Sequence, residues 1–198
     1  MKKSGGRKKQ RLDALDRSDY NSTSLESLKS LLRCLEVALR ADAHNGGAWI
    51  REGDSQRFDL LLVPLGKLLQ ARIEPSTSDK ITYQGLIQGN NTESGSVVDC
   101  MVALASAAGE EQLWKPLNHS ILQACGNEER AEVRKAGVMC LASLIRSIGE
   151  EYMVLVPECL PVLSELLEDN DEEIVGLAQE CISLSEEFLG ESLQDSLR

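Results

Sequence analysis

The sequence predicts an all-α protein built of stacked helical hairpins. Hydrophobic residues make up 42% of the chain, enough for a substantial core, but aromatic residues make up only 4%. A core of leucine, valine, isoleucine and alanine suits helices packed on helices better than an aromatic-rich β-sandwich. In the second half of the chain, a glycine recurs about every 40 residues after an apolar helical segment, at Gly109, Gly149 and Gly190.

These glycines are expected to close the tight turns between paired helices. Each follows the last apolar residue of a helix, where a left-handed backbone conformation is needed and glycine has no Cβ penalty. The acidic residues after Gly109 and Gly149 should begin the next helix, because the amide end of a helix favours negative charge. Other residues keep the same interval, namely Cys100, Cys140 and Cys181, Val133 and Ile174, and Pro116 and Pro157. A period near 40 residues with two helices per unit is typical of HEAT or armadillo repeats, so we expect an α-solenoid.

The repeats are expected to end in a capping unit. Asn170 can cap the last helix, with Glu173 three residues further on. Arg134 follows a valine in a pattern common in the first helices of HEAT units, whereas Val175 occupies the equivalent place in the last unit. The loss of that basic residue fits a terminal, capping repeat.

The first half of the chain is less regular. Leucines at helical spacing predict a helix over about residues 24–41, with Thr23 and Glu26 as a capping box. A glycine pair ends this helix, Asp54 can cap the next one, and Pro64 should kink it.

The chain is therefore expected to divide into four parts. The segment between the two regular regions is rich in Gly, Ser, Thr and Asn, which predicts a loop in which a short turn near residues 81–87 is left open. The four parts are a flexible basic and polar tail (1–21), a divergent helical hairpin (22–73), the loop (74–96) and C-terminal HEAT repeats with a terminal cap (97–198).

Charge is distributed unevenly along the chain. The net charge is -11, yet the first eleven residues carry six basic side chains and no acid, so residues 12–198 carry -17. The body should repel nucleic acid, whereas the arm could pair with RNA phosphates, act as a nuclear localisation signal, or only solubilise the chain. No apolar segment follows the arm and no later run could span a membrane, so an intracellular protein is expected. The arm residues are Lys2, Lys3, Arg7, Lys8, Lys9 and Arg11.

The sequence offers little for catalysis, metal or cofactor binding. The six cysteines form no C-x-x-C pair and the only histidines are His44 and His119, so no metal site or cofactor is expected and the thiols should be reduced and buried. His119 and Ser120 suggest a hydrolase triad at first sight, but neighbouring helical residues point about 100° apart and no nucleophile loop accompanies them. We expect no catalytic residues and no enzyme activity.

Two surfaces are candidates for binding a partner. Trp49 lies between predicted helices and is the better surface candidate of the two tryptophans, since Trp114 should pack between adjacent repeats. An acidic run could meet a basic protein, although a solvated turn that favours the next helix is the simpler interpretation. The run contains Glu168, Asp169, Asp171, Glu172 and Glu173.

Four segments together resemble one family. They read LWKPLNHSIL, EVRKA, EEYMVLVPECLPVLSELLEDNDEEI and LGESLQ. They are similar to the C-terminal region of HEAT repeat-containing protein 1, also called small-nucleolar-RNA-associated protein 10. The resemblance is strong over about residues 97–195, weaker over residues 24–72, and does not cover the basic arm.

The resemblance implies a non-catalytic scaffold of the small-subunit processome in the nucleolus. Its members act in processing of the precursor of small-subunit ribosomal RNA, with processome proteins as partners and pre-rRNA or small nucleolar ribonucleoprotein contacted indirectly or through the arm. They are several times longer than this chain, so the outer face of the first hairpin is expected to expose apolar side chains and either to bind a partner or to self-associate. Two alternatives stay open: a general HEAT adaptor unrelated to ribosomes, and an RNA-binding protein that uses the basic arm.

Overall fold

The computed structural model describes residues 22–52, 55–71, 83–87 and 95–193, in which all regular elements are helices. The predicted all-α class is therefore confirmed. The elements are α2 (Ser22–His44), α3 (Ala48–Arg51), α4 (Gln56–Leu69), α5 (Tyr83–Ile87), α6 (Val97–Ala108), α7 (Glu111–Cys125), α8 (Ala131–Ile148), the 3₁₀ helix η1 (Gly149–Leu155), α9 (Val156–Leu166) and α10 (Glu172–Leu189).

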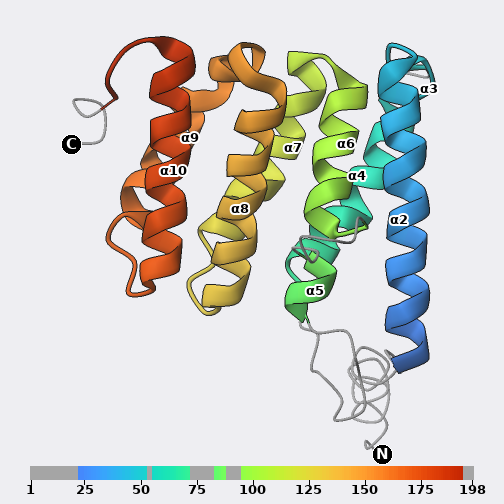
Figure 1. Cartoon of the computed structure of the whole chain (residues 1–198), viewed down its shortest axis with the longest axis horizontal. Helices are drawn as coiled ribbons and strands as arrows, with labels where there is room; N and C mark the ends of the chain where they lie inside the picture. The colour runs from blue at the N-terminus through green and yellow to red at the C-terminus, as the bar shows by residue number, and fades with distance from the viewer. Residues whose placement is uncertain (1–21, 53–54, 72–82, 88–94, 194–198) are drawn as a thin grey trace, which may run out of the picture.

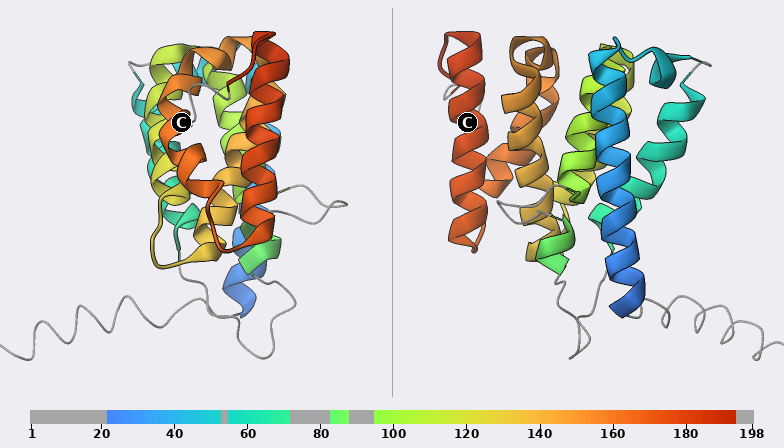
Figure 2. Two further views of the ribbon diagram at one scale, coloured as in Figure 1. Left: turned by 90° about the vertical axis from the view of Figure 1, so that its left-hand side faces the viewer. Right: turned by 45° about the vertical axis from the view of Figure 1, so that its right-hand side comes forward.

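The helices stack in two layers. One layer runs α2, α6, α8, α10, and each of these helices contacts the next; the other runs α4, α7, α9 in the same way. Figure 1 shows the first layer in front with α2 and α10 at opposite ends, and the end view in Figure 2 separates the two layers. This arrangement is the helical-repeat solenoid that the glycine period predicts.

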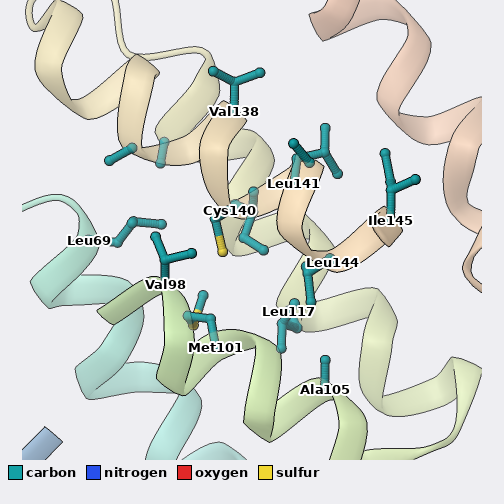
Figure 3. Packing of buried hydrophobic residues seen from close by; sticks show 14 of the residues in the cluster. Leu69, Val98, Met101, Ala105, Leu117, Val138, Cys140, Leu141, Leu144 and Ile145 are labelled. Carbon is teal, nitrogen blue, oxygen red and sulfur yellow. The ribbon is translucent and has the colours of Figure 1, made fainter. Parts of the chain in front are cut away.

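One hydrophobic core runs through the stack, from Leu25 in α2 to Leu193 after α10. Figure 3 shows its centre, where Met101 of α6, Leu117 of α7 and Leu144 of α8 meet. Because α2 and α4 both pack on α6, the first hairpin and the later units share this core.

The left-handed backbone conformation predicted for the three repeated glycines is found at two of them and not at the third. Gly109 and Gly190 adopt the left-handed conformation, with φ of 59° and 71°. Gly149 has φ 73° but ψ -138°, and the 3₁₀ helix η1 follows it where an α-helix was expected. Pro157 lies in the first turn of the shorter helix α9, where the missing N–H of a proline needs no partner.

The helices of the first half begin at other residues than predicted. Helix α2 starts at Ser22, so Thr23 lies inside it and is not its N-cap. The expected break contains the short helix α3, and α4 continues through Pro64. The expected cap Asp54 lies outside the described residues. Helix α5 forms where the sequence left a short turn open.

The cap of the last helix is Asp171 rather than Asn170. Its carboxylate accepts a hydrogen bond of 2.9 Å from the Glu173 backbone N–H. A carboxylate suits this place better than an amide, since it also interacts favourably with the positive end of the helix.

Exchange of Asp171 for alanine is expected to cost about 1 kcal/mol of unfolding free energy, because the α10 amide loses its acceptor. The matched change Asn170→Ala should cost less than about 0.5 kcal/mol, since Asn170 is exposed and outside the cap. Urea unfolding followed by circular dichroism measures both. An equal loss in the two variants would contradict the assignment of the cap.

Candidate interaction surfaces

The described residues contain no cluster of side chains that could bind a metal ion. No group of three or more His, Cys, Asp or Glu side chains in this part of the chain could hold a metal ion. His119 lies exposed on the surface of α7, with its Nε2 atom 3.1 Å from the Gln123 amide nitrogen. Within the same residues, no helix is long and apolar enough to cross a membrane.

Five of the six cysteines are buried, as expected, but Cys34 is exposed on α2. Burial raises the pKa of the Cys100 and Cys159 thiols to about 12. These thiols stay protonated and donate to backbone carbonyls, Cys100 to Leu32 at 3.2 Å and Cys159 to Leu155 at 3.3 Å. The expectation of buried thiols is therefore wrong for Cys34, because the outer side of α2 has no helix packed on it among the described elements.

The acidic run is largely used to join the last two units. Both carboxylate oxygens of Asp169 accept from the Arg134 guanidinium of α8, Oδ2 from Nε at 2.6 Å and Oδ1 from Nη2 at 3.1 Å. The Arg134 hydrogen bonds lower the pKa of Asp169. Glu173 pairs with Lys135, while Glu168 and Glu172 are exposed. Asp169 and Glu173 are thus engaged within the chain, so fewer carboxylates of the acidic run are available to a partner than the sequence suggests.

A second arginine joins more distant parts of the stack. Arg130, just before α8, donates to the backbone carbonyls of Gln70 and Ala71 at the end of α4, both at 3.0 Å. Arg134 also donates to the Asn127 carbonyl at 3.0 Å. Sequence analysis linked Arg134 to the repeat pattern but missed Arg130, whose partners are backbone atoms some 60 residues away that no side-chain pattern reveals.

A buried polar cluster between α7, η1 and α9 was also missed. Asn118 is fully buried, and its Oδ1 atom accepts from the Tyr152 hydroxyl at 2.8 Å and from the Cys159 thiol at 3.4 Å. Trp114 lies beside it, with its ring 6.3 Å from that of Tyr152 and its indole N–H donating to the Ala105 carbonyl. The predicted packing role of Trp114 is confirmed, and the whole cluster is structural.

Trp49 lies on the surface, in a fixed orientation. Its side chain is 49% exposed, and the Arg57 guanidinium lies 5.3 Å from the centre of its ring. Arg57 also donates to the Trp49 carbonyl, and the Asp42 carboxylate accepts from the backbone N–H groups of Trp49 and Ile50. An exposed aromatic held in place loses little conformational freedom on binding, so Trp49 remains a candidate contact for a partner.

Large apolar side chains are concentrated at one end of the stack. Of the exposed ones in the described residues, most lie on α2, α3 and α4, while η1 and α10 contribute only Val154 and Leu189. The exposed set on the first three helices is Leu31, Val37, Trp49, Leu60 and Val63. The basic arm, the remaining sequence candidate, lies outside the described residues.

Comparison with known proteins identifies the class of protein. An uncharacterized protein of Arabidopsis thaliana is 32% identical over 192 residues, which cover 96% of this chain and 8% of that protein. HEAT repeat-containing protein 1 of Homo sapiens is 31% identical over 141 residues, covering 70% of this chain and 6% of that protein. U3 small nucleolar RNA-associated protein 10 of Chaetomium globosum is 36% identical over 118 residues, covering 60% of this chain and 7% of that protein. No family model matches the chain.

Fold and comparisons together define an α-solenoid of the HEAT-repeat class. More particularly, the chain is related to the family of HEAT repeat-containing protein 1 and U3 small nucleolar RNA-associated protein 10, as its sequence segments predict. The chain spans less than a tenth of the length of these three relatives.

Proposed function

We propose that the chain is a non-catalytic binding module that acts in ribosome biogenesis, in the nucleolar processing of pre-rRNA by the small-subunit processome. The observation that carries the proposal is its sequence identity with proteins named for their association with U3 small nucleolar RNA. The partners we propose are processome proteins, contacted through the solenoid surface.

The use of the charged side chains supports binding rather than chemistry. Hydrogen bonds of Arg130, Arg134 and Asp169 connect different parts of the stack, so these charged groups stabilise the packing of its units. A stack of hairpins offers a long surface for contact with another macromolecule. The exposed Trp49 and the carboxylates of Glu168 and Glu172 are the residues we propose for contact at its two ends.

A tagged full-length chain should recover processome proteins from nuclear extract, and this recovery should survive nuclease. Protein contacts do not depend on intact RNA, so the amount of co-purified protein, quantified by mass spectrometry, should stay the same while pre-rRNA is lost. The variant Trp49→Ala should reduce the recovery several-fold if this side chain is an anchor.

Two controls separate the alternatives. Deletion of residues 1–11 should leave the nuclease-resistant recovery of processome proteins unchanged. If the deletion abolishes this recovery, and nuclease does so as well, RNA binding by the arm is favoured instead. Recovery of other proteins without any processome component would contradict the proposed function and favour a general adaptor.

A further inference from the structure

Helix α2 carries apolar side chains on two neighbouring sides. One side packs into the core through leucines at heptad spacing, Leu25, Leu28, Leu32, Leu35 and Leu39. The other side, here called the outer stripe, is exposed to solvent and consists of Leu31, Cys34, Val37, Ala38 and Ala41. Its two largest side chains, Leu31 and Val37, are 67% and 60% exposed. A helix that is apolar on both sides is normally buried on both sides.

The outer stripe continues an interface that already exists in the stack. Helices α6 and α8 each pack on two other helices of the layer that contains α2, whereas α2 packs on one helix of this layer, α6, and on the short helix α3. Helices α3 and α4 stand at the same end of the molecule as α2 and add Trp49, Leu60 and Val63 to the exposed apolar surface (Figure 2). A further helix stacked on α2 would extend the layer by one more contact of the same kind.

Charge favours a second copy of the chain as the occupant. Residues 126–193, at the α10 end, carry sixteen acidic side chains against four basic ones, so two such ends repel each other. The charges of the α2 end nearly balance, so two copies can meet there with their acidic ends pointing away from each other. The charged residues of this end are Lys29, Arg33, Arg40, Arg51, Arg57 and Lys67, and Glu26, Glu36, Asp42, Glu52 and Asp59.

We propose that the outer stripe of α2 is a two-fold interface through which two copies of this chain associate end to end. A two-fold axis places the same surface of both copies face to face, so that each residue of α2 has its counterpart on the other copy, and the interface is self-complementary. The small residues Cys34, Ala38 and Ala41 let the two helix backbones approach closely. The result is one continuous layer of helices that runs through both copies.

The oligomeric state of the full-length chain tests this interface. Sedimentation velocity and light scattering over a concentration series should show a monomer–dimer equilibrium. The double variant Leu31→Glu, Val37→Glu should raise the dissociation constant about tenfold or more, because each interface then holds four carboxylates in apolar contact. The matched control Ser183→Glu, exposed on α10 at the other end, should leave the equilibrium unchanged. Circular dichroism checks that the variants stay folded.

Cys34 gives a second measurement that does not depend on these variants. It is the only exposed cysteine in the described residues and lies within the outer stripe. A short bis-maleimide should therefore link two native chains into a covalent dimer, and Cys34→Ser should abolish the link. A chain that stays monomeric at all concentrations, or a dimer that resists the double variant and forms no link through Cys34, would overturn the proposal.

Discussion

Replacement of Gly47 by alanine is expected to destabilise the fold by about 3 kcal/mol or more. A Cβ atom at this position would lie 1.9 Å from the backbone oxygen of Ala107 in α6, a contact that no side-chain movement can relieve. The residue also has φ +68°, which side chains with a Cβ rarely adopt. Relief of the clash requires the α2–α3 turn to move away from α6, which it packs on. Urea unfolding measures the loss.

The neighbouring glycine supplies a matched control. Gly46 has φ +74°, but a Cβ atom there would have only the end of the Arg51 side chain near it, at 3.7 Å. Gly46→Ala should therefore cost only the backbone strain of about 1 kcal/mol. The difference between the two variants isolates the close approach of the turn to α6. Similar losses in both would mean that Gly47 is needed only for its backbone conformation.

This contrast also shows how far sequence reasoning can go. The glycine pair at 46–47 was predicted to end the first helix, and it does, since both residues adopt positive φ. The contact of Gly47 with Ala107 joins residues that are far apart in the chain, and no local pattern reveals it. In the same way, the period of about 40 residues predicted the helical units but not the 3₁₀ helix η1, since Pro116, the counterpart of Pro157, lies inside the continuous helix α7.

The candidate surfaces were harder to predict than the fold. Sequence identified the acidic residues after α9 but could not show that Asp169 would be held by Arg134 of the preceding unit. The exposed stripe on α2 did leave a signal in the sequence, because apolar residues at 31, 34, 38 and 41 follow a second heptad beside the core leucines. An apolar outer face was expected on this hairpin, but its residues were not named, because only the exposure shows which apolar side chains face away from the core.

Loss of the pair between Arg134 and Asp169 is expected to cost about 2 kcal/mol in either single variant, Arg134→Ala or Asp169→Ala. The pair is bidentate and mostly shielded from water, since the two side chains are 18% and 7% exposed, so each variant leaves the other charge poorly solvated. A double-mutant cycle should give a coupling free energy of about 1 to 2 kcal/mol. The pair Lys135 and Glu173 joins α8 to α10, but the Glu173 side chain is 69% exposed, so its coupling should stay below about 0.5 kcal/mol.

The pH dependence of this pair has a definite sign. The hydrogen bonds from Arg134 lower the pKa of Asp169 below its ordinary value of 3.8, so the ionised carboxylate stabilises the folded state above that value. This contribution disappears as the pH falls from about 4 through the lower folded pKa, because the carboxylate then becomes protonated in both states. The difference in unfolding free energy between the native chain and Asp169→Asn should therefore be constant near neutral pH and shrink in acid. A difference that grows on acidification would mean that Arg134 does not hold the ionised form of Asp169.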